Sequence, residues 1–491
     1  MLRKIFSYGS LAILSVTFQL ILIIYAVTVG SKIPTVGFFY LFISITSILY
    51  ITSSSMSCIY KFGWITLILL FPFYGGIFYI LFNRHHSVNA IHKKMLHFLS
   101  DSIKKVNSLP VQNPLQYYLY KTAGFPLLES SESHYYPDGE QLFEAMLQKI
   151  REAKKYVYIE FFIIADGIAW KRLEKLLAYK VKNGVDVRII FDGGGCLFVK
   201  PKGFKKNLRR LGINFREFNP ISLRITGRVN YRNHRKIIVC DGEYAFCCGI
   251  NISDEYMNYK ERFGKWKDTG IMVSGAGAES FSAMFCGMWN YLSSKKEISF
   301  THSSVYEQTG DLVQPFSETP LDNESVSLKT YLSLIASAKS SVYITTPYLI
   351  CDDEMINALT FTAQKGIETI IIVPGIPDKR FVYALTRSYY KTLLKAGVKI
   401  YEYSPGFIHS KTIVIDNETA ICGTINFDCR SMYLLFECAC VFYGGSIPSE
   451  ISHDFLNTVE VSRRVTDEKL PKENVIVRIA RGFLRLFAPL L

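Results

Sequence analysis

The sequence lacks the cysteine patterns that are typical of disulfide frameworks, redox motifs and zinc sites. Its 11 cysteines are an odd number, no two of them form a C-x-x-C pair, and no cysteine and histidine cluster has the spacing of a zinc site. In a chain of 491 residues, such cysteines are expected to be reduced and buried. That expectation favours a main domain that faces the cytosol.

Charged residues are scarce as well, at 20% of the chain, whereas hydrophobic residues make up 49% and the mean hydropathy is +0.16. This composition excludes a disordered chain, a coiled coil and a collagen-like fibre. The length leaves room for two or three domains. The net charge of +14 indicates an anionic partner, and on charge alone nucleic acid and anionic lipid are both open.

The first 83 residues contain three uncharged runs, of 27, 28 and 22 residues. Their apolar segments lie at 11–29, 36–51 and 64–82. Because a helix needs about 20 apolar residues to cross a bilayer, we predict a membrane region with two to three segments at 1–83. No small-residue cleavage site follows the first run, which disfavours a cleaved signal peptide.

Basic residues flank this region on both sides. Arg3 and Lys4 precede it, and Arg84, Lys93 and Lys94 follow it. The positive-inside rule then predicts a multi-pass protein whose main domain is cytoplasmic. Both flanks can be cytoplasmic only with an even number of crossings, so one run is expected to be re-entrant or interfacial.

After a polar connector at 84–137, the chain repeats itself. Three segments return in the same order: 150–159 as 335–344, 183–190 as 365–372, and 211–220 as 396–405. In each copy a helical pattern ends at a Gly and a short β-branched run follows, which is typical of the αβ unit of a parallel or mixed sheet. The repeat predicts an α/β fold with two tandem domains related by a pseudo-two-fold axis.

We place the first domain at 138–300 and the second at 328–460, joined by a Ser/Thr/Asp/Glu-rich linker at 301–327. The remaining residues, 461–491, form a basic amphipathic tail. This tail is expected either to pack on the second domain as a surface helix or to lie on anionic lipid.

Each copy contains the motif His-x-Lys-x-x-x-x-Asp, followed by an Asn 17 residues after the His. The matched residues are His234, Lys236, Asp241 and Asn251 in the first copy, and His409, Lys411, Asp416 and Asn426 in the second. A His and a Lys two apart on a strand face the same side, so the imidazole and the ammonium group converge on one anion.

One histidine from each half, on opposite sides of a phosphorus atom, would suit in-line displacement at a phosphodiester. One imidazole would attack to form a phosphohistidine, and the other would act as acid and then base. The lysines and asparagines would neutralise the phosphate oxygens, so we predict no metal ion and no other cofactor.

The second ring nitrogen of each histidine is expected to contact a carboxylate. The candidates are Asp268, 34 residues after His234, and Glu437, 28 residues after His409.

Two pairs of motif residues keep a second interpretation. Asp241 and Asp416 precede Gly and Asn after an apolar strand, which is also an ordinary hairpin turn, so structural support and direct chemistry are both open. Asn251 and Asn426 are expected to contact phosphate, with a turn role as the alternative.

The paired motifs resemble those of the phospholipase D superfamily, and within it the chain is most similar to bacterial cardiolipin synthases. The segments 248–256, 407–416 and 423–431 carry this resemblance, together with the apolar run at 64–81. One departure is Cys248, where a Gly-Gly pair is usual, and there we expect an adjustment of packing.

The resemblance implies two phospholipase D-like α/β/α domains behind N-terminal membrane helices, in a bacterial cell membrane. It implies transfer of a phosphatidyl group from one phosphatidylglycerol to another, giving cardiolipin and glycerol, with no nucleic acid partner. The family's catalytic residues correspond here to His234, Lys236, Asp241, His409, Lys411 and Asp416. A phospholipase D-type hydrolase and, less well supported, a non-catalytic basic membrane scaffold are the alternatives.

Overall fold

The computed structural model describes most of the chain: residues 34–54, 58–72, 74–82, 96–98, 100–104, 106–221, 231–299, 310–322, 324–466, 468, 482, 484 and 485. The chain divides into two compact units. One unit comprises residues 1–89, 221–230 and 482–490, and the other comprises 90–220, 231–481 and 491.

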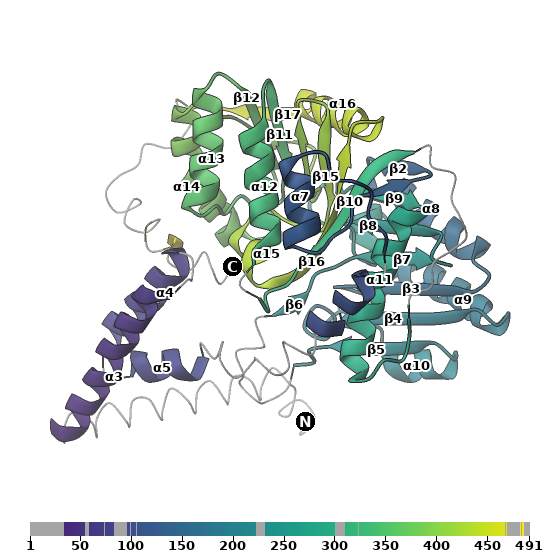
Figure 1. Ribbon diagram of the computed structural model, residues 1–491, viewed down its shortest axis with the longest axis horizontal. Helices are drawn as coiled ribbons and strands as arrows, with labels where there is room; N and C mark the ends of the chain where they lie inside the picture. Colours follow the sequence, from purple (N-terminus) through teal and green to yellow (C-terminus); the bar gives the residue numbers. More distant parts are fainter. Residues whose placement is uncertain are drawn as a thin grey trace. The chain divides into compact units, whose positions relative to one another are not determined.

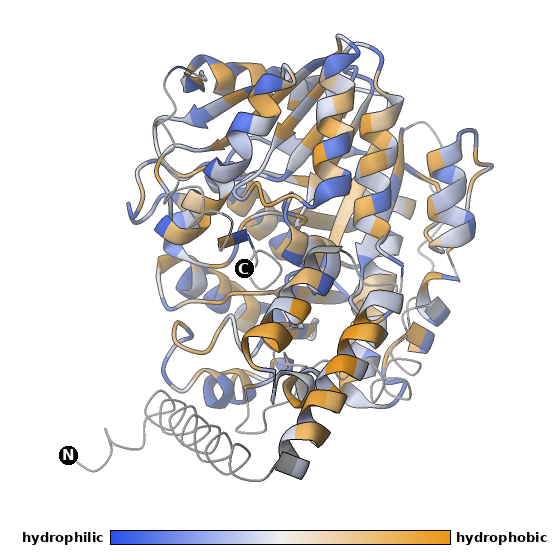
Figure 2. Cartoon of the chain, turned by 90° about the vertical axis from the view of Figure 1, so that its left-hand side faces the viewer, coloured by the Kyte–Doolittle hydropathy of each residue, from blue (hydrophilic) through white to orange (hydrophobic). Residues whose placement is uncertain are grey.

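The described part of the N-terminal unit is helical and apolar (Figures 1 and 2). It consists of α3 (Pro34–Ser53), α4 (Cys58–Leu70) and α5 (Gly75–Phe82). None of the helices among the described residues is both long enough and apolar enough to cross a membrane. The predicted segment at 11–29 and the basic flank at 84–94 lie outside the described residues.

The predicted segment at 64–82 is not one helix. Pro72 has no backbone N–H and disfavours a helical conformation of the residue before it, so α4 ends at Leu70 and a new helix begins at Gly75. At Gly76, a Cβ atom would lie 2.7 Å from the Cα of Ser44, so only glycine allows this close packing of α5 on α3.

The second unit contains two mixed sheets (Figure 1). The first has the strand order β2 (Ser133–Tyr136), β9 (Gly270–Ser274), β8 (Tyr244–Cys248), β7 (Ile237–Cys240), β3 (Tyr156–Phe161), β4 (Asp186–Asp192) and β5 (Asn214–Phe218). Its helices are α8 (Gly139–Glu152), α9 (Ile168–Lys182), α10 (Phe204–Arg210) and α11 (Ala276–Ser293), with the 3₁₀ turn η4 (Asp254–Met257).

The second sheet has the order β1 (Leu128–Ser130), β10 (Asp311–Glu318), β16 (Leu435–Tyr443), β15 (Thr419–Gly423), β14 (Thr412–Ile415), β11 (Ser341–Thr345), β12 (Glu368–Pro374), β13 (Lys399–Tyr403) and β17 (Ser462–Val465). A further short strand, β6 (Arg232–Asn233), pairs with β16. The helices are α7 (Pro114–Tyr117), the π-helix η2 (Tyr118–Thr122), α12 (Val326–Ser337), α13 (Asp353–Gln364), α14 (Arg380–Lys395), α15 (Cys429–Tyr433) and α16 (Ile447–Glu460).

The two sheets share one topology, which confirms the predicted α/β repeat. The order β9-β8-β7-β3-β4-β5 in the first half corresponds to β16-β15-β14-β11-β12-β13 in the second. In both halves the last three strands of that order are parallel and the others are antiparallel. Amphipathic helices such as α8 cover the sheets and bury their apolar faces, because successive turns carry apolar residues such as Phe143 and Met146 on one side.

The segments predicted as connector and linker also contain strands. The connector at 84–137 contributes β1 and β2, and the linker at 301–327 contributes β10, which pairs along β16. The polar composition of the linker concealed this strand, whose Val313 and Phe316 are fully buried.

The aspartates of the two motifs lie in turns at the ends of β7 and β14. Asp241 has φ 56° and Asp416 has φ 54°, a left-handed conformation that aspartate tolerates better than most residues. Each is five residues beyond the motif lysine, about 16 Å along an extended strand. The structure therefore places neither aspartate beside the motif histidines.

Their carboxylates bind the backbone that enters the neighbouring strand. Asp241 accepts hydrogen bonds of 2.6–2.8 Å from the N–H groups of Lys154, Lys155 and Tyr156. Asp416 accepts the equivalent bonds, of 2.7–2.9 Å, from Lys339, Ser340 and Ser341. The direct catalytic role predicted for both aspartates is thus replaced by structural support, the alternative that the hairpin pattern had left open.

Replacing Asp416 by Ala should lower stability without touching the site directly. Burial opposes ionisation of Asp416, but the three backbone N–H groups outweigh it and lower its pKa. Loss of such a cap costs about 1–2 kcal/mol, which a lower melting temperature in detergent would report. Asp416→Asn, which keeps an acceptor and tolerates the turn, should cost less; equal melting temperatures for wild type and Asp416→Ala would contradict this role.

Candidate active site

The two motif histidines lie at the same edge of their respective sheets. In the first half, β7 begins beside the carboxyl end of β3, with Ile237 opposite Glu160, so His234 lies just beyond that end. In the second half Thr412 pairs with Thr345 at the end of β11, and His409 lies just beyond it. The carboxyl edge of parallel strands is where α/β sheets usually present their functional groups.

Each histidine is held by a backbone hydrogen bond to the other half. The N–H of His234 donates to the carbonyl oxygen of Phe436 at 2.9 Å, and the N–H of His409 donates to that of Lys267 at 2.7 Å. Backbone pairing accompanies both hydrogen bonds. The strand β6 runs parallel to the start of β16 (Figure 1), and Lys267 forms an isolated β-bridge with Ile408. The two histidines therefore lie where the halves meet.

The two candidate carboxylates do contact the histidines, but the partners are exchanged. Nδ1 of His234 lies 2.8 and 3.0 Å from the two carboxylate oxygens of Glu437, and Nδ1 of His409 lies 2.6 Å from Oδ2 of Asp268. The prediction that each carboxylate serves the histidine of its own copy is wrong. Because Phe436 and Lys267 bind the histidine backbones of the opposite half, the residues that follow them face the opposite histidines.

The carboxylates are fully buried and differ in their support. The hydroxyl of Thr424 donates to Oε2 of Glu437. The equivalent position in the first half is Gly249, where a Cβ atom would lie 1.9 Å from Oδ1 of Asp268. Thr424 is a residue that the sequence prediction missed, although it lies two residues before Asn426.

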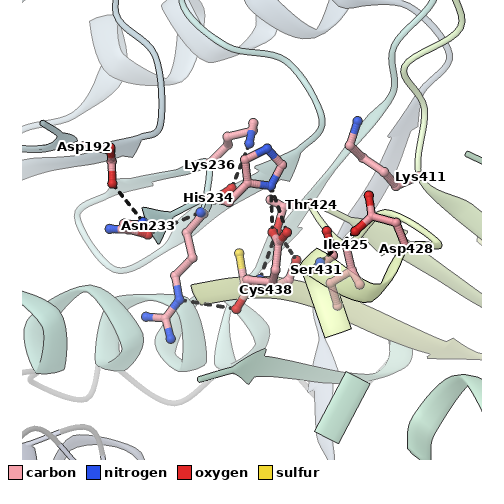
Figure 3. Close-up of polar contacts among 12 residues, drawn as sticks. Asp192, Asn233, His234, Lys236, Lys411, Thr424, Ile425, Asp428, Ser431 and Cys438 are labelled. Atoms are coloured by element: carbon pink, nitrogen blue, oxygen red, sulfur yellow. Dashed lines mark hydrogen bonds and ion pairs between the residues drawn. The ribbon is translucent and has the colours of Figure 1, made fainter. Parts of the chain in front are cut away.

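The motif lysines follow one pattern in both halves. Nζ of Lys236 donates to the carbonyl oxygen of His234 at 2.7 Å, and Nζ of Lys411 donates to that of His409. Both side chains are buried, and Figure 3 shows Lys236 and Lys411 near the ring of His234. The arrangement places two amino groups beside the histidines, away from solvent.

Burial shifts the ionisation of these groups toward their neutral forms. Burial, followed by the positive charges of the lysines, lowers the pKa of His234 and lowers that of His409 to about 4. Burial also lowers the pKa of Lys411 to about 7 and raises that of Glu437 to about 8. An anion that entered the site would favour the protonated, charged forms of these histidine and lysine side chains.

The carboxylate contact determines the tautomer of His409. Asp268 can only accept, so we assign the proton to Nδ1 and leave Nε2 with a free lone pair. Nζ of Lys411 lies 2.8 Å from the same Nδ1, but a protonated Nδ1 cannot accept a hydrogen bond. Lys411 therefore donates to the carbonyl oxygen of His409. A neutral ring with an unprotonated Nε2 can attack phosphorus or take a proton.

Aromatic side chains surround both rings. Phe162 lies edge-on to His234, with 5.1 Å between ring centroids. Tyr256 and Trp266 lie 5.4 and 5.5 Å from His409. None of the three was predicted, because a single aromatic residue carries no motif. Together they limit the access of water to the reacting groups.

The two asparagines differ in how they are bonded. Asn251 is engaged by protein, since its Oδ1 accepts from the N–H of Ile163 at 3.1 Å and its Nδ2 donates to Oη of Tyr256 at 2.7 Å. In contrast, Oδ1 of Asn426 is buried and has no hydrogen-bond partner among the residues that the structure describes. Contact of either side chain with phosphate stays a prediction.

Ten cysteines of the second unit are buried, and none of them forms a disulfide bond within the described part of the chain. Cys248, the departure from the family pattern, packs in the core of the first half. No group of three or more His, Cys, Asp or Glu within the described part of the chain could hold a metal ion.

Comparison with known proteins agrees with this geometry. Residues 146–279 and 331–459 match the family model described as cardiolipin synthase, PLD-like domain. The chain is 32% identical over 444 residues to a cardiolipin synthase of Geobacillus thermodenitrificans (strain NG80-2), which covers 87% of this chain and 88% of the relative. An uncharacterized protein of Streptococcus mutans is 39% identical over 462 residues, covering 91% of this chain and all of the relative.

Among solved structures, phosphatidylserine synthase of Haemophilus influenzae Rd KW20 is similar in fold, with a TM-score of 0.59 at 14% identity. The similarity covers 77% of this chain and 100% of the synthase chain. From the two matched repeats and the relatives that extend over most of its length, we conclude that the chain belongs to the cardiolipin synthase family of phospholipase D-like proteins.

Proposed function

We propose that this protein is a phosphatidyltransferase that makes cardiolipin from two molecules of phosphatidylglycerol and releases glycerol. The observation that carries the proposal is the pair of buried histidines, one from each half, each held by a carboxylate of the other half. The relatives named cardiolipin synthase, which match most of the chain, supply the substrate class.

In the first step, Nε2 of His234 attacks the phosphorus atom of one phosphatidylglycerol. The bound phosphodiester anion favours the protonated form of His409. The bond from phosphorus to the head-group glycerol oxygen breaks, and His409, which has taken up a proton on Nε2 as the anion binds, gives that proton to the oxygen. The product is a phosphatidyl group on His234 and free glycerol. The choice of His234 as nucleophile follows the resemblance to relatives with two motifs.

In the second step, a hydroxyl of the second phosphatidylglycerol attacks the same phosphorus atom. His409, now neutral, takes the proton of that hydroxyl, and the bond from phosphorus to His234 breaks. Lys236 and Lys411 neutralise the non-bridging oxygens in both steps. The buried carboxylates Glu437 and Asp268 hold the two rings in position.

Transfer rather than hydrolysis is supported by the surroundings of the site. His234 and His409 are only 8% and 6% exposed, and aromatic rings cover them. Water therefore competes poorly with an alcohol that the protein binds.

We also propose that the N-terminal unit places the protein in the bacterial cell membrane as a multi-pass protein, with the catalytic unit in the cytoplasm. Exposed apolar side chains on α3 support a lipid environment, since Phe38, Phe42 and Leu49 are 75%, 65% and 63% exposed.

The function is tested by giving purified protein in detergent pure phosphatidylglycerol and quantifying cardiolipin, glycerol and phosphatidic acid. Cardiolipin and glycerol should appear in equal amounts, and His234→Ala and His409→Ala should each lower turnover by roughly 10³-fold or more, because the two rings act as a unit. Phosphatidic acid without cardiolipin would replace the transferase by a hydrolase. Absence of any turnover would favour a scaffold.

Replacing Glu437 by Gln should change both the turnover and the pH dependence of the stability, and the two can be measured separately. The amide keeps a hydrogen bond but cannot stabilise a charged ring, so turnover should fall by about 10²–10⁴-fold. Because burial raises the pKa of Glu437, its contribution to stability should fall as the pH rises from about 4.5 to about 8, so the difference in unfolding free energy between wild type and variant should change over this range. Wild-type turnover in the variant would contradict the role of Glu437, and Asp268→Asn provides the matched change at His409.

Anion affinity should depend on pH through Lys411. With its pKa lowered to about 7, Lys411 loses its charge above that pH unless an anion is bound. Sulfate affinity, measured by calorimetry from about pH 6 to pH 9, should therefore fall by up to tenfold per pH unit above 7. Lys411→Met should bind sulfate weakly and with a smaller dependence, which is left by Glu437 because its pKa is raised to about 8; a flat wild-type profile would refute the assignment.

A further inference from the structure

Two equivalent loops of the catalytic unit expose apolar side chains. The first, 193–203, follows β4 and exposes Phe198 and Val199 by 82% and 42%. The second, 375–381, follows β12, includes the first two residues of α14, and exposes Ile376 and Phe381 by 40% and 42%. A single exposed apolar residue needs no explanation, but exposed apolar residues in the equivalent segment of both halves do.

Positive charge accompanies both loops. No acidic residue occurs between Asp192 and Glu217. Lys200 and Lys202 lie in the first loop, and Lys206, Arg209 and Arg210 follow on α10, whereas Lys205 and Arg216 form ion pairs with Glu217 and Glu297. In the second loop Lys379 and Arg380, together with Asp378, lie between the two exposed apolar residues. Large apolar side chains next to clustered lysine and arginine are typical of segments that lie in the head-group region of an anionic bilayer.

The first loop adjoins the site through Phe162. Gly195 packs so closely on this ring that a Cβ atom would lie 2.8 Å from it, and Phe162 in turn contacts His234. At the base of the same loop, Asp192 accepts a hydrogen bond of 3.0 Å from the N–H of Asn233, the residue before His234 (Figure 3).

The second loop adjoins the site through Tyr348. The hydroxyl of Tyr348 donates to Asp378 at 2.6 Å, and its ring contacts Phe407, which contacts the ring of His409. The loops therefore flank the two histidines from opposite halves, at the carboxyl edges of β4 and β12.

We propose that loops 193–203 and 375–381 form one surface, the two-loop surface, that docks on an anionic phospholipid bilayer with Phe198 and Ile376 in its apolar layer. This inference rests on the proposed function in taking the bilayer as the source of the substrate. Docking there brings a head group to the histidines while its acyl chains stay in the bilayer. Transfer of one large apolar side chain from water is worth roughly tenfold or more in affinity, and each nearby cation adds to it.

The test uses the full chain in nanodiscs that contain phosphatidylglycerol, with tryptophan introduced by Phe198→Trp or Ile376→Trp. The control is Phe361→Trp, because Phe361 is 63% exposed near the end of α13 that leads into the opposite edge of β12. Lipids brominated on the acyl chains should quench the added emission at positions 198 and 376 and not at 361. Equal quenching at all three positions would overturn the proposal.

A second measurement relates docking to turnover. The double variant Phe198→Asp/Ile376→Asp should turn over phosphatidylglycerol in nanodiscs at least about tenfold more slowly than Phe361→Asp, at an unchanged melting temperature. Equal rates for the two variants would refute docking by this surface. The quenching result does not depend on the reaction catalysed, so a failure to form cardiolipin would count against the proposed function and leave this inference standing.

Discussion

Backbone hydrogen bonding between the two halves is the interaction on which the site depends. Two backbone hydrogen bonds, from His234 to Phe436 and from His409 to Lys267, place each motif beside the other half. As a result, Glu437 serves His234 and Asp268 serves His409. Neither half holds a complete set of the candidate catalytic groups, so the candidate site forms only when both halves have folded and docked.

The same arrangement buries several ionisable side chains close to one another. Two lysines and two histidines are buried together, with the carboxyl groups of Glu437, Asp268 and Asp428 close enough to act on them. Burial lowers the pKa of Lys411 and His409 and raises that of Glu437, which means that the empty site is held short of its full charge. A phosphodiester anion would restore the charged forms of the lysines, and that gain favours binding of the substrate at the reacting centre.

Much of the fold and of the site could be predicted from the sequence because the segments that form them occur in two copies. The repeated segments indicated two α/β halves, and the paired motifs indicated His234, Lys236, His409 and Lys411. Asp268 and Glu437 were found by position before and within apolar strands, but their partners were assigned to the wrong histidines. Spacing along the chain shows which residues share a strand and cannot show which half that strand pairs with.

Other differences have local causes. Asp241 and Asp416 belong to the motif by spacing, yet their carboxylates bind backbone N–H groups at the far ends of β7 and β14. The strand β10 lies in a segment that is polar on average but buries Val313. Sequence averages conceal such strands, because one buried face is enough to hold them in a sheet.

The most direct test is to detect the covalent intermediate. Wild-type protein mixed with phosphatidylglycerol, quenched with alkali within the first turnover and digested, should yield a peptide that carries a phosphatidyl group on His234. The same procedure on His234→Ala should yield no such adduct on any residue. An adduct on a side chain other than His234, or cardiolipin formed with no adduct at all, would contradict a mechanism in which the two histidines act on one phosphorus atom in these roles.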